Sequence, residues 1–152
     1  MQPAGVPEPI TIDRMAVGMC FGCGQANHEG LRMTFARYAD GTVESRHQTA
    51  PHHCGVDTVV HGGIQATLLD EVMGVAAQLG LEDGAESMPC VTAEMQLAYK
   101  RPVLIADEVV VRARLVEVDG RDLHIEGAIV GADGTLLTTG VSRWRQLREV
   151  PS

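Results

Sequence analysis

The segment HGGIQATLLDEVMGVAAQLG, residues 61–80, decides the fold of this chain. Large apolar side chains recur in it at helical spacing, at Ile64, Leu68, Val72, Val75 and Leu79. A second stripe holds small residues and one acid, at Gly63, Ala66, Asp70, Gly74 and Ala77. A helix that is apolar almost all round is buried in its domain, so we predict a long central helix from about His61 to Gly80.

Segments on both sides of this helix alternate apolar and polar residues or are rich in Thr and Val, which is typical of strands. They cover residues 31–35, 43–48, 91–99, 109–115, 123–126 and 136–146. Asp-Gly pairs, which favour tight hairpin turns, occur at Asp40-Gly41, Asp119-Gly120 and Asp133-Gly134. The order β-β-α-β-β-β-β predicts an α+β domain in which an antiparallel sheet covers the central helix.

The composition excludes two classes of partner. The 152 residues include 20 acidic and 12 basic side chains, for a formal net charge of −8, and only 3% are aromatic. Nucleic-acid binding needs basic surfaces or aromatic stacking platforms, so we expect no nucleic-acid partner. The most apolar stretch, residues 62–81, contains two adjacent acids at its centre, so we expect no membrane span either.

The N-terminal region differs in composition from the rest of the chain. Residues 1–19 contain three prolines, little periodicity and no secretory signal, so we expect a loosely docked tail there. Residues 20–148 then form a single domain. Four cysteines are too few for a disulfide framework in a chain of this length, which predicts a reduced, cytoplasmic protein.

The start of the helix, Val60-His61-Gly62-Gly63, is the first candidate site. Paired glycines at a helix start leave backbone N–H groups open to a ligand, with the positive end of the helix dipole behind them. Such a start suits an oxyanion or another anion. Glycines that merely permit close packing on the sheet are the simpler explanation, and the pair alone favours it.

Asp70 and Glu71, two turns inside the helix, are the second candidate site. Carboxylates are almost never fully buried without a partner, because desolvating them is expensive. Either they pair with arginines such as Arg101 or Arg143, or they lie in a cleft and act as a base or nucleophile. Neighbouring helix residues point about 100° apart, so the two acids do not share one role.

Several short motifs share a consistent order over about residues 20–146. They are Cys20-Phe21-Gly22-Cys23-Gly24, Asn27, Gly30-Leu31, His61-Gly62-Gly63, Leu69-Asp70-Glu71 and Tyr99-Lys100-Arg101-Pro102. Together they resemble the hotdog-fold acyl-CoA thioesterases of the phenylacetate-pathway type. The resemblance implies a curved antiparallel sheet wrapped around a long helix, and a homodimer or homotetramer with active sites at the subunit interface. It also implies hydrolysis of an acyl-CoA thioester to a carboxylic acid and CoA.

The resemblance assigns roles to individual residues. Asp70 would attack the thioester carbonyl or activate water, while the N–H of Gly62 would polarise that carbonyl. His61 would orient the site, and Thr92, on a strand crossing from the partner subunit, would help to hold the water. The substrate-binding residues implied are Gly63, His53, Arg101 and Glu71. For the CoA phosphates, Arg143 and Arg145 are further candidates, although all three arginines also fit solvated charges at strand edges.

One position departs from the family pattern. Several relatives carry Asn or Gln six residues before the histidine of the helix start, where this chain has Gly55. His52 or His53 is a candidate to replace that side chain. A turn-forming polar loop after Pro51 is the simpler interpretation of these histidines.

Cys20-x-x-Cys23 is half of a zinc signature, and His52, His53 and Cys54 could complete four ligands. No second Cys-x-x-Cys or His-x-x-x-His follows. A packed, glycine-rich turn with free thiols is therefore the favoured interpretation, and we assign neither a metal nor a cofactor.

Two other functions remain open on the same fold. One is a non-catalytic acyl-CoA-binding regulator, although regulators of that kind usually have a DNA-binding segment ahead of the domain. The other is a hotdog enoyl-CoA hydratase or dehydratase, for which a histidine before two glycines is a poor match. Hydrolysis of an acyl-CoA panel favours the thioesterase, tight acyl-CoA binding without turnover favours the regulator, and hydration of an enoyl-CoA favours the hydratase. The sequence does not identify the acyl group.

Overall fold

The computed structural model describes residues 2–11 and 18–152, so part of the predicted tail, residues 12–17 with Met1, lies outside the described residues. The strands are β1 (Glu8–Pro9), β2 (Ala36–Arg37), β3 (Val43–Gln48), β4 (Cys90–Tyr99), β5 (Glu108–Asp119), β6 (Asp122–Gly131) and β7 (Leu136–Gln146). The helix α2 spans Gly62–Leu79, which confirms the predicted central helix. Short 3-10 helices, η1 (Pro51–His53) and η2 (Gly84–Glu86), precede and follow it.

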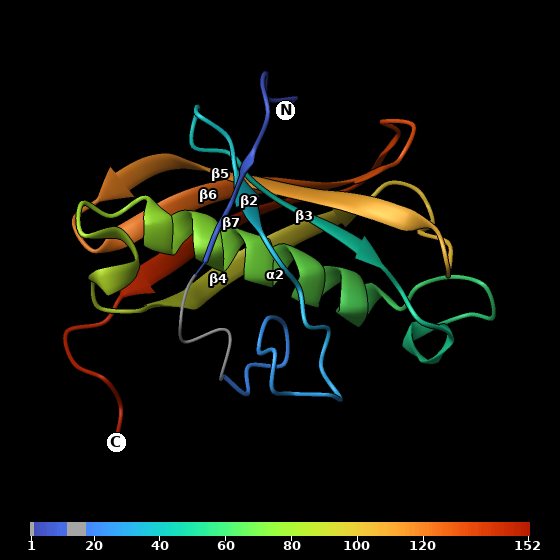
Figure 1. Cartoon of the computed structure of the whole chain (residues 1–152), viewed down its shortest axis with the longest axis horizontal. Helices are drawn as coiled ribbons and strands as arrows, with labels where there is room; N and C mark the ends of the chain where they lie inside the picture. Colours follow the sequence, from blue (N-terminus) through green and yellow to red (C-terminus); the bar gives the residue numbers. More distant parts are fainter. Residues whose placement is uncertain (1, 12–17) are drawn as a thin grey trace.

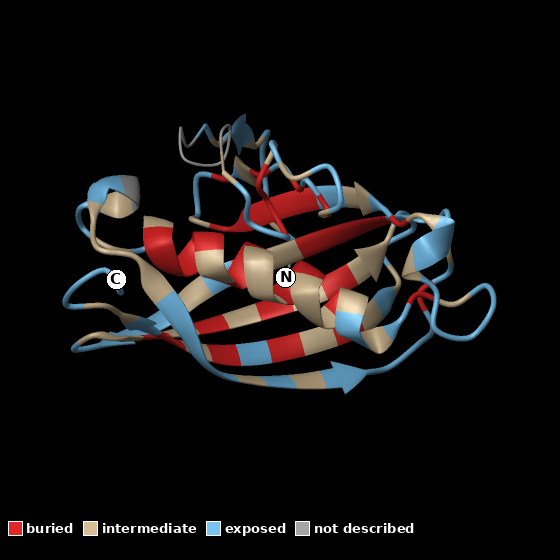
Figure 2. Cartoon of the chain, turned by 90° about the horizontal axis from the view of Figure 1, so that it is seen from below, coloured by how far each residue is buried: buried red, intermediate tan, exposed pale blue. Residues whose placement is uncertain are grey.

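The strands form one antiparallel sheet in the order β1-β2-β3-β5-β6-β7-β4, and α2 lies against one face of it (Figure 1). Figure 2 shows the buried residues gathered between the helix and the sheet that curves around it. On α2 they include Leu68, Leu69, Val72 and Met73, which are fully buried. The predicted α+β hotdog architecture is therefore confirmed. Among the described residues, no helix is both long and apolar enough to cross a membrane.

The Asp-Gly pairs form the turns that the sequence predicts. Gly41, Gly120 and Gly134 have φ angles of 87°, 59° and 85°, in the left-handed region that glycine adopts without strain. Each lies between two consecutive antiparallel strands, namely β2 and β3, β5 and β6, or β6 and β7. These turns fix the lengths of the hairpins and thereby their register.

The N-terminal part of the sheet differs from the prediction. Residues 31–35 are not a strand, although the alternate side chains Leu31, Met33 and Phe35 are buried. Their backbone groups instead pair with irregular segments: Leu31 N–H donates to Phe21 O at 2.8 Å, and Met33 N–H to Gly22 O at 2.9 Å. The predicted tail in turn contributes the short strand β1, which pairs with β2. The order is therefore β-β-β-α-β-β-β-β.

The strand β4 lies at an edge of the sheet and is paired on one side, with β7. Its alternation predicts a buried face, yet Val91 and Tyr99 are exposed and Met95 and Leu97 are only partly buried. The ten residues of β4 therefore leave apolar side chains and one row of backbone groups open to a partner.

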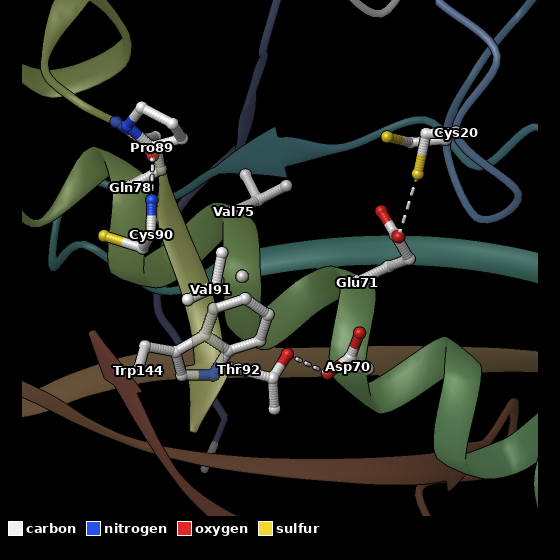
Figure 3. Close-up of a pocket in the computed structure, with 12 residues that line it drawn as sticks. Cys20, Asp70, Glu71, Val75, Gln78, Pro89, Cys90, Val91, Thr92 and Trp144 are labelled. Carbon is white, nitrogen blue, oxygen red and sulfur yellow. Dashed lines mark hydrogen bonds between the residues drawn. The ribbon is translucent and has the colours of Figure 1, made fainter. Parts of the chain in front are cut away.

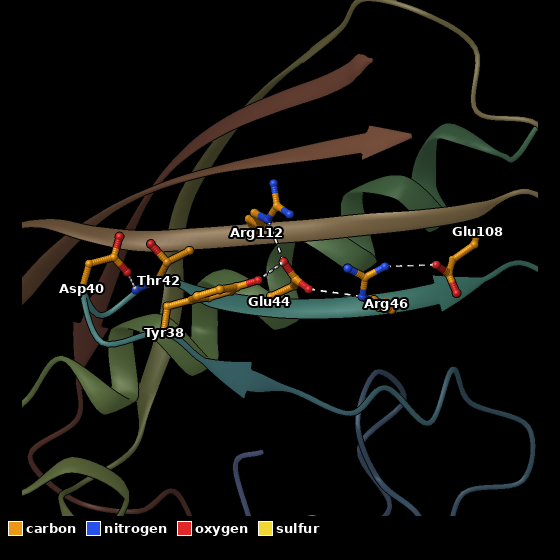
Figure 4. A network of polar contacts seen from close by, with 7 residues as sticks. All are labelled: Tyr38, Asp40, Thr42, Glu44, Arg46, Glu108 and Arg112. Carbon is orange, nitrogen blue, oxygen red and sulfur yellow. Dashed lines mark hydrogen bonds and ion pairs between the residues drawn. The ribbon is translucent and has the colours of Figure 1, made fainter. Parts of the chain in front are cut away.

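A buried acid links the strands β3 and β5, in the part of the sheet away from β4 (Figure 4). Glu44 on β3 is 4% exposed and accepts a 2.7 Å hydrogen bond from Arg112 Nε on β5. Tyr38 donates its hydroxyl to the same carboxylate at 3.1 Å, and Arg46 lies 3.3 Å from its other oxygen. The Glu44 carboxylate thus has three partners where β3 and β5 pair, namely Arg112, Tyr38 and Arg46. A buried charge requires such partners.

Candidate active site

Asp70 lies near the middle of α2 and faces the first residues of β4. Thr92 Oγ1 donates a hydrogen bond of 2.7 Å to Asp70 Oδ1. Both side chains line a cavity of about 510 Å³ between the helix and the strand, whose walls include Val75, Val91 and Trp144 (Figure 3). The small residue Gly74, one turn after Asp70, leaves room for the Trp144 ring: a Cβ there would lie 2.7 Å from it. The helix therefore presents a carboxylate to an apolar cavity.

The surroundings of Asp70 change its acidity in two directions. Burial raises the pKa of this carboxyl above its ordinary value, and the negative charge of Glu71 adds to that effect. The hydrogen bond from Thr92 opposes both, because it stabilises the ionised form. A carboxylate held in this way is a stronger base than one in water and is well suited to proton abstraction or attack.

Glu71 points away from Asp70, toward the segment before β2 (Figure 3). Cys20 Sγ donates to its Oε1 at 3.1 Å, and Cys23 lies beside them. Burial, with the adjacent Glu71, raises the pKa of the Cys23 thiol. The alternative in which Arg143 pairs with these acids is wrong, since Arg143 pairs with Glu94 and Asp122. The two neighbouring acids thus have separate surroundings, as the helical geometry predicts.

The helix start is arranged more specifically than the glycine pair suggests. His61 caps the helix, because its Nδ1 accepts a 2.9 Å hydrogen bond from Gly63 N–H. The N–H of Gly63 is therefore not free to bind an anion. Gly62 differs: its carbonyl accepts from the Tyr99 hydroxyl at 3.0 Å, while its N–H has no acceptor among the described residues. Of the two glycines, Gly62 is the open donor.

The loop before the helix braces His61. His61 N–H donates to the His53 carbonyl at 2.9 Å, and the His53 ring closes the preceding turn by accepting from Ala50 N–H at 3.1 Å. Burial, together with the neighbouring His52, lowers the pKa of His53. A Cβ on Gly55 would lie 3.2 Å from His61 Cα, so a side chain at this position would press on the helix start. The loop positions His61 mainly through its backbone.

Arg101 lies in the loop that follows β4 and is exposed. Its backbone N–H donates to Leu137 O at 3.0 Å. Two residues later, Val103 O accepts from Val60 N–H at 2.8 Å, next to the start of α2. The guanidinium makes no ion pair within residues 2–11 and 18–152, which leaves a free positive charge on the loop beside the helix start.

The predicted catalytic residues fall into two groups. Asp70 and Thr92 form one, and the hydrogen bond between them corrects the expectation that Thr92 reaches Asp70 from a partner subunit. His61 and Gly62 form the other. Gly62 and Asp70 are eight positions apart, and at a rise of about 1.5 Å per position the two groups are about 12 Å apart along the helix axis. One thioester cannot contact both groups within one copy of the chain.

Gln78 is a site residue that sequence analysis missed. It is 3% exposed, and its amide nitrogen donates to the Ser87 hydroxyl at 2.9 Å and to Gly84 O at 3.1 Å. Its amide oxygen accepts from Cys90 N–H at 3.1 Å. Gln78 therefore fixes the start of β4, two residues before Thr92. A polar residue inside the apolar helical segment was the only signal for it.

One group of side chains among the described residues has the geometry of a metal site. The ligand atoms of Cys20, Cys23 and Glu71 all lie within 4.8 Å of one another. The alternative set of zinc ligands is not assembled, since His52, His53 and Cys54 do not belong to this group. None of the four cysteines, all of which lie in the described residues, forms a disulfide.

A family model described as the Thioesterase superfamily matches residues 57–138, more than half of the chain, including α2 and the strands β4 to β6. The chain belongs to the thioesterase superfamily. The match contains Asp70, Thr92 and the helix start, whereas Cys20, Cys23 and His53 lie outside it.

Among relatives of this thioesterase-superfamily chain, the mouse acyl-coenzyme A thioesterase THEM4 is 32% identical over 115 residues. The match covers 73% of the chain and 46% of the mouse protein, so the chain spans about half the length of the curated relatives it matches. A Bacillus halodurans protein solved with CoA is 27% identical, with a TM-score of 0.67 over 79% of this chain and 77% of the other. The Escherichia coli PaaI protein of the phenylacetic acid degradation operon, 13% identical with a TM-score of 0.68 over 86% and 87%, shares the fold.

Proposed function

We propose that this chain hydrolyses acyl-CoA thioesters to a carboxylic acid and CoA, with Asp70 as general base or nucleophile. The observation that carries this proposal is the Thr92–Asp70 pair at the wall of a cavity of about 510 Å³. Membership of the thioesterase superfamily and similarity to an acyl-coenzyme A thioesterase support it. The apolar walls beside Asp70 and Thr92, which include Val75, Val91 and Trp144, suit a substrate with an apolar acyl group.

The chemistry follows from the thioester itself. With Asp70 as the base, its carboxylate takes a proton from water while the water oxygen attacks the carbonyl carbon. The carbonyl oxygen becomes an oxyanion, which a fixed backbone N–H stabilises more than it stabilises the neutral carbonyl. The C–S bond then breaks, and the CoA thiolate leaves and is protonated by Asp70. Thr92 has two roles, since it orients the carboxylate and keeps it ionised.

We infer that a complete site needs two copies of the chain. Gly62 is the open N–H donor, yet it lies about 12 Å along the helix from Asp70. In a two-fold dimer, Gly62 of one copy can face Asp70 of the other, and the symmetry creates two equal sites. The open edge of β4 supports such a partner, because Thr92 lies on this strand and Tyr99, also on it, contacts Gly62.

Substrate binding completes the proposal. His61 caps the helix and holds Gly62 in place, and Gly63 allows the His61 ring to approach its N–H. Arg101, beside the same helix start, is the candidate for the CoA phosphates, since its guanidinium is free among the described residues. His53 and Glu71 contribute indirectly. His53 acts through the loop that braces His61, and Glu71 acts through its charge, which raises the pKa of Asp70.

Location is part of the same proposal. We propose that the protein works in the cytoplasm. None of its four cysteines forms a disulfide, and the reducing conditions of that compartment keep thiols in the reduced form.

The proposal is tested by thiol release from a panel of acyl-CoA thioesters. Asp70→Asn should lower kcat on the best substrate by about 10²–10⁴-fold, the usual contribution of a positioned general base. Asp107→Asn, an exposed acid in the loop before β5, is the matched control and should retain wild-type rates. Equal rates for wild type and Asp70→Asn would contradict the role of Asp70. Tight acyl-CoA binding without turnover in the wild type would favour a binding protein instead.

The two-copy site is tested by mixing two inactive variants. Asp70→Ala and Gly62→Pro damage different halves of the site. Refolded together in equal amounts, they should regain about a quarter of the wild-type activity, because half of the dimers are mixed and each has one intact site. A mixture that stays inactive while mixed dimers form would place both halves in one chain.

A further inference from the structure

Cys20, Cys23 and Glu71 neither donate nor accept a proton in the hydrolysis proposed above. The three side chains line the same cavity as Asp70. Glu71 is next to Asp70 on α2 but faces another direction (Figure 3). We propose that Cys20, Cys23 and Glu71 bind a zinc ion, a site distinct from the Asp70–Thr92 pair. Glu71 is the ligand that Cys-x-x-Cys alone does not reveal.

The distances fit a tetrahedral ion. Zinc lies about 2.3 Å from sulfur and about 2.0–2.2 Å from oxygen, which places its ligand atoms about 3.6–3.8 Å apart. In the structure the three ligand atoms lie within 4.8 Å of one another, and the Cys20 Sγ to Glu71 Oε1 distance is 3.1 Å. These separations differ from those of a tetrahedral zinc site by about 1 Å at most.

The turn that carries the cysteines is built around Glu71. Gly24 N–H donates to Cys20 O at 2.9 Å and closes the turn. A Cβ on Gly22 would collide with the Glu71 side chain, and a Cβ on Gly24 would collide with the backbone of Gly18 and Cys20. Both glycines are thus required for this close approach. The glycine-rich turn that the sequence predicts is present, and the structure adds an acid close to its two thiols.

The charges around the cavity favour a cation. Its described lining contains the carboxylates of Asp70 and Glu71 and the thiols of Cys20, Cys23 and Cys90, but no Lys, Arg or His. Glu71 also forms no ion pair with any residue that the structure describes. A partly buried carboxylate without a positive partner is costly, and a divalent cation would remove that cost.

The ligand types select the ion. Two sulfur ligands with one carboxylate favour zinc over magnesium or calcium, which prefer oxygen alone. Binding converts both thiols to thiolates and releases two protons to solvent. Three protein ligands leave one of the four tetrahedral positions for a water molecule.

The test is the metal content of the full chain, purified in reducing buffer without a metal-affinity step. After chelation and dialysis, wild type should take up one zinc ion per chain in a titration with zinc chloride. Cobalt in place of zinc should give the absorption band that thiolate ligands produce. Glu71→Gln and Cys20→Ser should each weaken zinc binding at least about tenfold, the loss that even an outer-shell partner of a metal ligand causes.

Two controls make the result specific. Cys54→Ser removes an exposed thiol outside the group and should bind zinc like wild type, and so should Asp70→Asn, which loses hydrolysis. Zinc binding and hydrolysis are therefore separable outcomes. Equal uptake by wild type and by a folded Cys20→Ser, Cys23→Ser double variant would overturn the site. Loss of uptake in Cys54→Ser would also overturn it, since the ligands would then lie in the loop before α2.

Discussion

Thr92 on the edge strand and Asp70 on the central helix are joined by a hydrogen bond of 2.7 Å, in which the hydroxyl donates to the carboxylate. This bond opposes burial, which raises the pKa of Asp70. Activity that needs the ionised carboxylate should therefore fall as the pH drops through the pKa of Asp70. That acidic limb should lie above the pH at which an ordinary aspartate titrates.

Thr92→Val should move this acidic limb to higher pH. The variant loses the hydrogen bond that favours the ionised form, so the pKa of Asp70 rises further. The measurement is kcat/KM against pH for metal-free protein. Thr92→Ser retains the hydroxyl and should keep the acidic limb at the wild-type pH. If the limb does not move in Thr92→Val, the Thr92 hydroxyl does not affect the pKa of Asp70.

Gly62→Pro should abolish most activity while leaving the helix intact. Proline removes the N–H that we assign to the oxyanion, yet it is well tolerated at the first position of a helix. His61 has φ −55° and ψ 135°, a conformation that suits a residue before proline. We expect kcat to fall by about 10²–10³-fold, as for the loss of one oxyanion donor.

The matched control for that donor is Gly62→Ala. It keeps the N–H, and its Cβ would lie 3.6 Å from the Tyr99 ring, an ordinary contact. Circular dichroism establishes that both variants fold. If Gly62→Ala loses as much activity as Gly62→Pro, Gly62 is needed for its small size and not for its N–H group.

His47 should make the fold less stable below about pH 6.5. Burial lowers the pKa of His47, with a smaller contribution from the charge of His53, and its Nε2 is buried without a partner among the described residues. As the pH falls through the ordinary histidine pKa, His47 is therefore protonated in the unfolded chain before it is protonated in the folded chain. Stability is fully present above the ordinary histidine pKa and is lost as the pH falls below it. Thermal unfolding of His47→Gln should depend less on pH between about 5 and 7 than that of wild type.

Glu44→Ala should be among the most destabilising changes of a single charge. It leaves Arg112 and the Tyr38 hydroxyl without their acceptor. Since Arg112 remains 15% exposed, we expect a loss of about 3 kcal/mol in the free energy of unfolding, the lower end for a broken buried pair. Urea unfolding measures it. Glu126→Ala breaks the exposed pair with Arg114 and should cost only about 0–1 kcal/mol.

Local patterns predicted the helix and the turns well. The helix was expected from about His61 to Gly80 and spans Gly62–Leu79, and the last strand was predicted at its observed bounds, Leu136–Gln146. The helix is predicted from its periodicity, and the last strand from its Thr and Val residues after the Asp133-Gly134 turn. Both signals act between close neighbours in sequence. For the same reason Asp70 was recognisable as a charge inside an apolar helix.

Contacts between distant segments were beyond those patterns. Residues 31–35 have the alternation of a strand, but their N–H groups pair with Phe21 and Gly22. The bond from Cys20 to Glu71 joins positions 51 residues apart, and Thr92 reaches Asp70 only because β4 runs beside α2. Such pairings are decided by how the whole chain packs, and neither local propensity nor spacing encodes them.

Asp70 and Glu71 are consecutive residues, and a step of about 100° along α2 directs one to Thr92 and the other to Cys20. One residue inserted or deleted between Gly62 and Asp70 would turn both acids away from their partners. The length of this stretch is therefore fixed, whereas the hairpin turns at Gly41, Gly120 and Gly134 can grow without moving either acid. Insertions and deletions among relatives should accordingly fall in those turns and spare residues 62–71.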